Sequence, residues 1–130
     1  MSSRILMIED NEQNRYLATF LLERNGFQVE SAVDGAAGLR AAASNPPDII
    51  LLDIQLPKMD GHAVARALRE LRELDRTPII AVTSYAMVGD REKSLAAGCD
   101  GYIEKPIDPE TFVDTIRDIV EQVRHIRGRT

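Results

Sequence analysis

Short apolar runs alternate along the chain with longer segments of helical periodicity. Residues 5–8, 49–52 and 79–82 are apolar at consecutive positions, which is typical of parallel strands covered on both faces. Residues 27–30 alternate between apolar and polar side chains, which favours an edge strand with one face toward water. A further short run at residues 101–103 completes a set of five predicted strands.

Segments with apolar residues at helical spacing lie between and after these strands. Capping residues, glycine and proline mark their expected ends. We expect one helix through Leu17, Phe20 and Leu21 ending at Asn25-Gly26, one from Asp34 to Pro46-Pro47, one after Asp60-Gly61 with Val64, Leu68 and Leu71, one from Asp90 to Ala97, and one capped by Asp108 with Pro109 at its first position, followed by Phe112, Ile116, Ile119, Val120 and Val123. Each parallel connection needs a crossover, so the alternation predicts a doubly wound α/β fold with helices on both faces of the sheet.

Composition and charge narrow the class of protein. The length of 130 residues, with 44% hydrophobic and 28% charged residues, indicates one globular domain, expected over residues 1–123 with a short basic tail at 124–130. A net charge of −5 argues against direct DNA binding or an anionic membrane surface. No apolar run approaches the ~18 residues of a membrane span. The single cysteine fits a reducing compartment, so we expect a cytoplasmic protein.

Acidic residues follow the strands at the edge where open α/β sheets bind ligands. Glu9 and Asp10 follow the first strand, and Asp53 follows the third. If these two strands are neighbours, the three carboxylates repel one another unless protons or a cation compensate them. Oxygen ligands without His or Cys suit a hard divalent ion. The pattern therefore predicts a Mg²⁺ site.

Such a site suits phosphoryl transfer, in which catalysis depends on positioning and on neutralising charge. Asp53 ends the most apolar strand and is the best candidate for a nucleophile that forms an aspartyl phosphate. Lys105 and the hydroxyl of Thr83 follow the fifth and fourth strands and could each hold a phosphoryl oxygen. Taken alone, each of these residues could be an ordinary strand end, cap or loop residue. Their common edge favours the functional interpretation.

In order and spacing, these motifs resemble the receiver domain of two-component response regulators. The resemblance spans residues 4–123 and rests on Glu9-Asp10-Asn11, the stretch 53–61 (DIQLPKMDG), Val82-Thr83-Ser84 and Lys105-Pro106. It implies the CheY-like, flavodoxin-like arrangement, a five-stranded parallel sheet of strand order 2-1-3-4-5 with five helices.

The resemblance also implies the phosphoacceptor and the metal ligands. Asp53 would accept the phosphoryl group. Asp10, Asp53 and the backbone carbonyl of Gln55 would bind Mg²⁺, for which Mn²⁺ can substitute, and Glu9 would act through a metal-bound water.

Four further residues take roles from the same resemblance. Lys105 would hold the phosphoryl group from a loop shaped by a cis peptide bond to Pro106. Thr83 would move onto a phosphoryl oxygen, and the ring of Tyr102 would turn inward to fill the vacated space. Thr83 and Tyr102 would therefore form the switch pair.

The implied function is that of a single-domain response regulator in two-component or phosphorelay signal transduction, similar to stand-alone receivers of the DivK type. A histidine kinase or histidine phosphotransfer protein would donate the phosphoryl group, docking near Asn14 and Arg15. A downstream protein would bind the face of the fourth helix, fifth strand and fifth helix, including Met87, Val88, Tyr102 and Ile107. Such a switch is not expected to turn over an external substrate. The receiver of a hybrid histidine kinase is an open alternative.

Three competing functions fit parts of the pattern. A haloacid-dehalogenase-like phosphatase needs a second Asp two residues after its nucleophile, where this chain has Gln55, which cannot relay a proton. In a flavodoxin-like FMN carrier, Glu9 and Asp10 would repel the phosphate. A degenerate receiver that binds partners without phosphorylation would be expected to lack Asp10, Asp53 or Lys105, and all three residues are present.

Three other side chains that could carry chemistry receive structural interpretations. Cys99 follows Gly98 in a loop, without a His-Cys pair at metal-ligand spacing, and is expected to be a small packed thiol. His62 opens the third helix and is expected to face solvent. His125 lies in the tail, where it is not placed to donate a phosphoryl group.

Overall fold

The computed structural model describes residues 3–84 and 89–126 and contains one parallel sheet of strand order β2-β1-β3-β4-β5. The strands are β1 (Arg4–Ile8), β2 (Gln28–Ala32), β3 (Ile49–Asp53), β4 (Ile79–Thr83) and β5 (Gly101–Glu104). The helices are α1 (Glu12–Arg24), α2 (Gly35–Ser44), α3 (Gly61–Arg69), the 3₁₀ helix η1 (Arg72–Leu74), α4 (Asp90–Ala96) and α5 (Phe112–Ile126). The predicted doubly wound fold and strand order are confirmed. No helix of the described residues combines the length and apolar character needed to cross a membrane.

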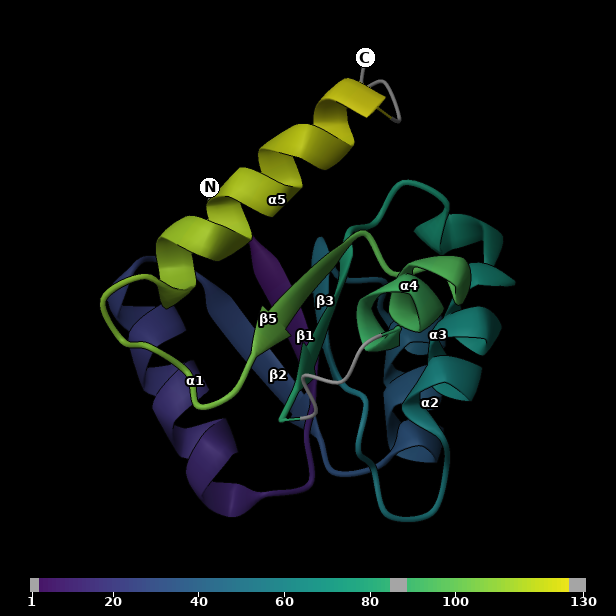
Figure 1. Ribbon diagram of the computed structural model, residues 1–130, viewed down its shortest axis with the longest axis horizontal. Coiled ribbons are helices and arrows are strands. Elements are labelled where there is room, and N and C mark those ends of the chain that lie inside the picture. The colour runs from purple at the N-terminus through teal and green to yellow at the C-terminus, as the bar shows by residue number, and fades with distance from the viewer. Residues whose placement is uncertain (1–2, 85–88, 127–130) are drawn as a thin grey trace.

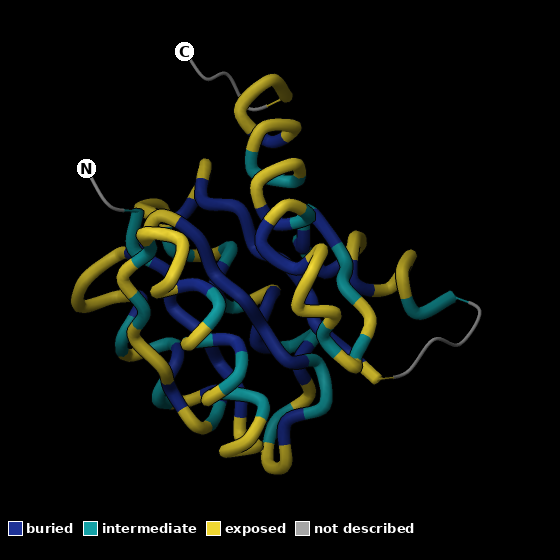
Figure 2. Tube along the Cα trace, turned by 90° about the vertical axis from the view of Figure 1, so that its left-hand side faces the viewer, coloured by how far each residue is buried: buried dark blue, intermediate teal, exposed yellow. Residues whose placement is uncertain are grey.

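Helices cover both faces of the sheet, as Figure 1 shows: α1 and α5 lie on one side, and α2, α3 and α4 on the other. Alternate residues of the central strands therefore enter two separate cores. Leu6 and Ile50 face the α2–α4 side, whereas Met7 and Leu51 face α1 and α5. In Figure 2 the buried strands cross the middle of the molecule beneath helices with exposed outer faces. This two-sided burial is the reason for the consecutive apolar positions in the strand sequences.

The edge strand β2 is shifted from its predicted range of residues 27–30. Phe27 belongs to the turn that closes α1, since its N–H donates to the carbonyl of Leu22 (3.1 Å) and Gly26 adopts a left-handed φ of 91°. At the other end, the N–H of Glu9 donates to the carbonyl of Ala32 (3.0 Å) and extends the pairing with β1. The strand therefore starts one residue later and ends two residues later than predicted.

The inner face of α1 also differs from the prediction. Ala18 and Leu22 are its buried residues, while Phe20 is 47% exposed. The guanidinium group of Arg24 lies 5.6 Å from the centre of the exposed Phe20 ring, a cation–π contact at the surface of the helix. The apolar residues that predict this helix therefore do not mark its buried stripe, which runs along Ala18 and Leu22.

Helix α5 begins at Phe112 and not at Pro109. The carboxylate of Asp108 accepts the N–H of Glu110 (3.0 Å), and its carbonyl accepts the N–H of Thr111 (3.1 Å). These bonds make a tight turn of residues 109–111 before the helix proper. At its other end α5 continues through Ile126, three residues past Val123.

Gly61 fixes the loop between β3 and α3. Its N–H donates to the carbonyl of Ile54 (3.2 Å), and a Cβ at position 61 would lie 2.4–2.7 Å from backbone atoms of Ile54. We expect Gly61→Ala to lower the free energy of unfolding by at least about 1 kcal/mol, because backbone must move to accept the methyl group. Urea denaturation measures this difference. Unchanged stability would contradict the close approach.

Candidate functional site

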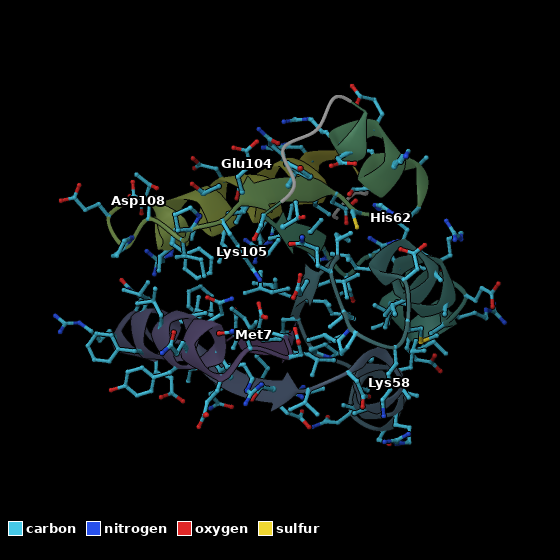
Figure 3. All side chains as sticks on the ribbon, turned by 60° about the horizontal axis from the view of Figure 1, so that its bottom comes forward. Met7, Lys58, His62, Glu104, Lys105 and Asp108 are labelled. Carbon is cyan, nitrogen blue, oxygen red and sulfur yellow. The ribbon has the colours of Figure 1, made fainter. Side chains whose placement is uncertain are left out.

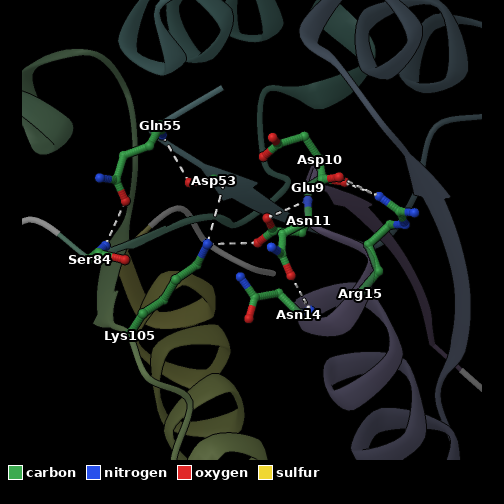
Figure 4. Close-up of polar contacts among 9 residues, drawn as sticks. All are labelled: Glu9, Asp10, Asn11, Asn14, Arg15, Asp53, Gln55, Ser84 and Lys105. Atoms are coloured by element: carbon green, nitrogen blue, oxygen red, sulfur yellow. Dashed lines mark hydrogen bonds and ion pairs between the residues drawn. The ribbon is translucent and has the colours of Figure 1, made fainter. Parts of the chain in front are cut away.

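Three carboxylates meet at the carboxyl edge of the sheet (Figure 4). Glu9 and Asp10 follow β1, and Asp53 ends β3, which pairs directly with β1 through Ile8 and Leu52. One oxygen from each acid lies within 4.8 Å of the others. Glu9 and Asp53 are only 4% and 3% exposed, whereas Asp10 faces solvent. The structure thus brings together the three acids on which the predicted metal site depends.

Lys105 supplies the positive charge of this cluster. Its Nζ lies 2.9 Å from Oε1 of Glu9 and 3.4 Å from Oδ2 of Asp53, and its side chain is 10% exposed. The residue follows β5, where its N–H donates to the carbonyl of Thr83 (2.8 Å) and its peptide bond to Pro106 is cis. Figure 3 shows Lys105 near the middle of the carboxyl edge. The cluster therefore combines acids from two strands with a lysine from a third.

Burial raises the pKa of Asp53 to about 6, and the carboxylate of Glu9 adds to the rise. The N–H of Gln55, which donates to Oδ1 of Asp53 (2.9 Å), and the ammonium group of Lys105 oppose it. Together these effects disfavour the ionised form of Asp53 at the carboxyl edge of the sheet. A divalent cation is the natural compensation, because the donors are carboxylate oxygens of the kind that Mg²⁺ prefers.

The loop between β1 and α1 is held by contacts that sequence reasoning missed. Nη1 of Arg15 donates to the carbonyls of Glu9 (3.0 Å) and Asp10 (2.9 Å). The side chain of Asn11 caps α1 by accepting the N–H of Asn14 (2.9 Å). Arg15 and Asn14 stand at the predicted docking surface for a phosphodonor, and the guanidinium group also orients the backbone of the acidic pair. No sequence signal marks a bond from an arginine to carbonyls five and six residues earlier.

Thr83 and Tyr102 line one hollow of about 210 Å³. Thr83 is buried at the end of β4, and Tyr102 is half-buried on β5. Burial, together with the carboxylates of Asp90 and Glu104, raises the pKa of Tyr102. The hollow is also lined by Ile54, Gln55, Asp60, His62, Asp90 and Ser94. The two residues of the predicted switch pair therefore share one space.

The predicted partner face is only partly described by the structure. Met87 and Val88 lie outside the described residues. Ile107 is half-buried, packs against the core that faces α1 and α5, and lines a small cavity beside Asp53.

His62 does not face solvent, contrary to the prediction. Its side chain is 16% exposed, and Nε2 lies 3.1 Å from the hydroxyl of Ser94 on α4, while Nδ1 lies 3.6 Å from Oδ1 of Asp60. Figure 3 shows the ring between α3 and α4. A contact between residues 32 positions apart has no signature in the local sequence. For this reason the start of the third helix wrongly indicated a solvent-facing position for His62.

Cys99 is a packed thiol, as predicted, with 4% of its surface exposed. Burial raises its pKa to about 12, so little thiolate forms at neutral pH. We expect the native thiol to react with Ellman's reagent at pH 8 on the order of 100-fold more slowly than in urea-unfolded protein. Comparable rates in the two states would contradict the packing.

The comparisons with known proteins agree on one family. The family model described as response regulator receiver domain matches residues 5–117. The polar-differentiation response regulator DivK of Brucella ovis is 40% identical over 117 residues, which cover 90% of this chain and 95% of DivK. The chemotaxis response regulator CheY4 of Vibrio cholerae superimposes with a TM-score of 0.87 at 28% identity, over 92% of this chain and 99% of CheY4.

A further similar structure bears on the metal. The receiver domain of the sensor histidine kinase PA1611 from Pseudomonas aeruginosa PAO1 is 33% identical and has a TM-score of 0.82, over 95% of this chain and 98% of that domain. Its structure holds a magnesium ion coordinated in the active-site cleft.

The chain belongs to the response regulator receiver domain family, whose members are signalling switches. Because the chain belongs to this family, it is neither a haloacid-dehalogenase-like phosphatase nor a flavodoxin-like FMN carrier by family. Receiver domains bind Mg²⁺ in an acidic pocket, and the cluster of Glu9, Asp10 and Asp53 provides such a pocket here.

Proposed function

We propose that Asp53 accepts a phosphoryl group from a phosphohistidine of a histidine kinase or histidine phosphotransfer protein in two-component or phosphorelay signalling. A bond forms from the Asp53 carboxylate to phosphorus as the bond from phosphorus to the donor imidazole breaks. The observation that carries the proposal is the setting of Asp53, a buried carboxylate beside two acids and within 3.4 Å of a lysine Nζ. Lys105, together with a cation held by the acids, would neutralise charge on a transferred group, as phosphoryl transfer requires.

The same acids fit a bound Mg²⁺. Asp10, Asp53 and the backbone carbonyl of Gln55 would hold the ion, with Glu9 acting through a water, and Mn²⁺ can substitute. When bound, the ion supplies positive charge to the phosphoryl oxygens. The hard oxygen donors of the cluster and the magnesium-bound receiver of PA1611 support this assignment.

Lys105 and the switch pair would respond to the phosphoryl group. Lys105 would hold one phosphoryl oxygen, and the Thr83 hydroxyl would donate to another. The ring of Tyr102 would then turn into the hollow that it shares with Thr83. The volume of this hollow, about 210 Å³, supports such a movement. The change biases a pre-existing equilibrium between two states of the partner-binding face.

The proposal includes the partners and the place of action. The phosphodonor docks near Asn14 and Arg15, and a downstream protein binds the face of α4, β5 and α5, so no direct contact with DNA is needed. In this proposal residues 1–123 form the receiver and residues 124–130 a basic segment, of which residues 124–126 continue α5. A cytoplasmic location fits the single cysteine, which has no disulfide partner within the chain.

Intact-mass analysis after incubation with acetyl phosphate tests the proposal. We expect one base-labile phosphoryl adduct that requires Mg²⁺ and is absent from Asp53→Asn. Asp118→Asn is the matched control, because it makes the same chemical change at an exposed position of α5 and should be labelled normally. A folded protein that binds Mg²⁺ and forms no adduct would contradict the proposal and favour a receiver that signals by binding alone.

A further inference from the structure

The side chain of Gln55 replaces a hydrogen bond of the sheet at the end of β4. The ladder between β3 and β4 includes the bond from the N–H of Ile54 to the carbonyl of Val82 (3.2 Å). In a parallel ladder the next bond would join the N–H of Ser84 to the carbonyl of Ile54. That carbonyl accepts instead from Gly61, and the N–H of Ser84 donates to Oε1 of Gln55 (2.8 Å; Figure 4). The Gln55 amide therefore ties together the loops that follow the two strands.

Gln55 is also bound to the phosphoacceptor. Its own N–H donates to Oδ1 of Asp53 (2.9 Å), so one residue contacts both Asp53 and the loop after Thr83. The N–H of Ser84 donates to the side chain of a residue two positions past Asp53, the last residue of β3. A phosphoryl group on Asp53 would bring charged oxygens to this edge, and backbone N–H groups are effective donors to such oxygens. In the unphosphorylated protein this donor is occupied by Gln55.

We propose that Gln55 is a positioning residue that acts as a latch in the resting state by holding Ser84, the residue that follows β4. Phosphorylation would exchange the Gln55 amide oxygen for a phosphoryl oxygen at the N–H of Ser84 and so release the side-chain tie between the two loops. The exchange is favourable because a charge-assisted hydrogen bond is stronger than a bond between neutral amides. This inference rests on the proposed phosphorylation of Asp53, and it adds a residue that opposes the active state.

Binding of beryllofluoride, a mimic of the phosphoryl group, tests the latch at saturating Mg²⁺. Gln55→Met removes the acceptor but keeps the length of the side chain and the backbone carbonyl. Because the resting state alone loses a bond, we expect the apparent Kd to fall by about 2- to 10-fold. Gln28→Met, the same change at an exposed position of β2, should leave the Kd unaltered. NMR should also show faster solvent exchange of the Ser84 amide in Gln55→Met before beryllofluoride is added.

The outcomes separate the latch from the proposed function. Tighter binding by Gln55→Met together with faster Ser84 exchange supports the latch. If the wild-type protein binds beryllofluoride and Gln55→Met binds it equally or more weakly, the latch is wrong while the phosphorylation of Asp53 stands. Failure of the wild-type protein both to bind beryllofluoride and to accept a phosphoryl group overturns the proposed function, and the latch with it.

Discussion

Replacing Asp53 by Asn is expected to stabilise the metal-free protein at neutral pH, besides abolishing phosphorylation. Burial raises the pKa of Asp53 from the ordinary value of 3.8 to about 6, so ionising this carboxylate at pH 7 costs native stability. The corresponding gain for the amide is about 2–3 kcal/mol in the free energy of unfolding. The side chain is buried, so solvent does not screen this term strongly.

The gain should depend on pH in a defined direction. Between pH 4 and pH 6 the native protein binds more protons at Asp53 than the unfolded chain does, so wild-type stability falls as pH rises through this window. Below it, the carboxyl group is protonated in both states and the advantage of Asp53→Asn disappears. Urea denaturation in EDTA at several pH values measures the difference. Added Mg²⁺ should reduce the difference, because a cation compensates the wild-type carboxylates.

Asp118→Asn is again the matched control, since Asp118 is exposed and its amide should give no comparable gain. An Asp53→Asn protein that is less stable than wild type at pH 7, or an advantage that grows toward pH 4, would contradict the raised pKa of Asp53.

The sequence predicts those parts of the site that strand order alone determines. Glu9, Asp10 and Asp53 each follow an apolar run, and the carboxyl ends of parallel strands share one edge, so their convergence needs no knowledge of side-chain conformations. The same reasoning places Thr83 and Lys105 at that edge. Fold class could be predicted for the same reason, because the apolar runs report burial on both faces of the sheet.

Contacts that depend on rotamers could not be predicted in this way. The hydrogen bonds between Ser84 and Gln55 and between His62 and Ser94 join residues about 30 positions apart in the chain, and each needs one particular side-chain conformation. Apolar character alone also does not say which stripe of a helix is buried: in α1 the stripe includes the small Ala18 and not Phe20. Such contacts modulate a site whose main components strand order has already assembled.

The second large effect is expected from replacing Lys105, because its ammonium group compensates the negative charge of two buried acids. In Lys105→Met, Glu9 and Asp53 lose the Nζ that lies 2.9 Å and 3.4 Å from their oxygens. Removing one partner of a buried ion pair costs about 3–5 kcal/mol, and protonation of Asp53 relieves part of that cost. We therefore expect a loss of about 3 kcal/mol in the free energy of unfolding in EDTA at pH 8, with a smaller loss at pH 6.

Mg²⁺ binding should change in the opposite direction. The ammonium group competes with the cation for the same carboxylates, so Lys105→Met should bind Mg²⁺ more tightly and recover much of its stability when Mg²⁺ is added. Its response to phosphorylation should nevertheless be lost, because no lysine remains to hold a phosphoryl oxygen. Lys58→Met, the same change at an exposed position of the β3–α3 loop, is the control. Calorimetric titration with Mg²⁺ and urea denaturation separate the two effects. Competition between Lys105 and the cation requires tighter Mg²⁺ binding in a less stable protein. Weaker Mg²⁺ binding with unaltered stability would instead mean that Lys105 supports the metal site.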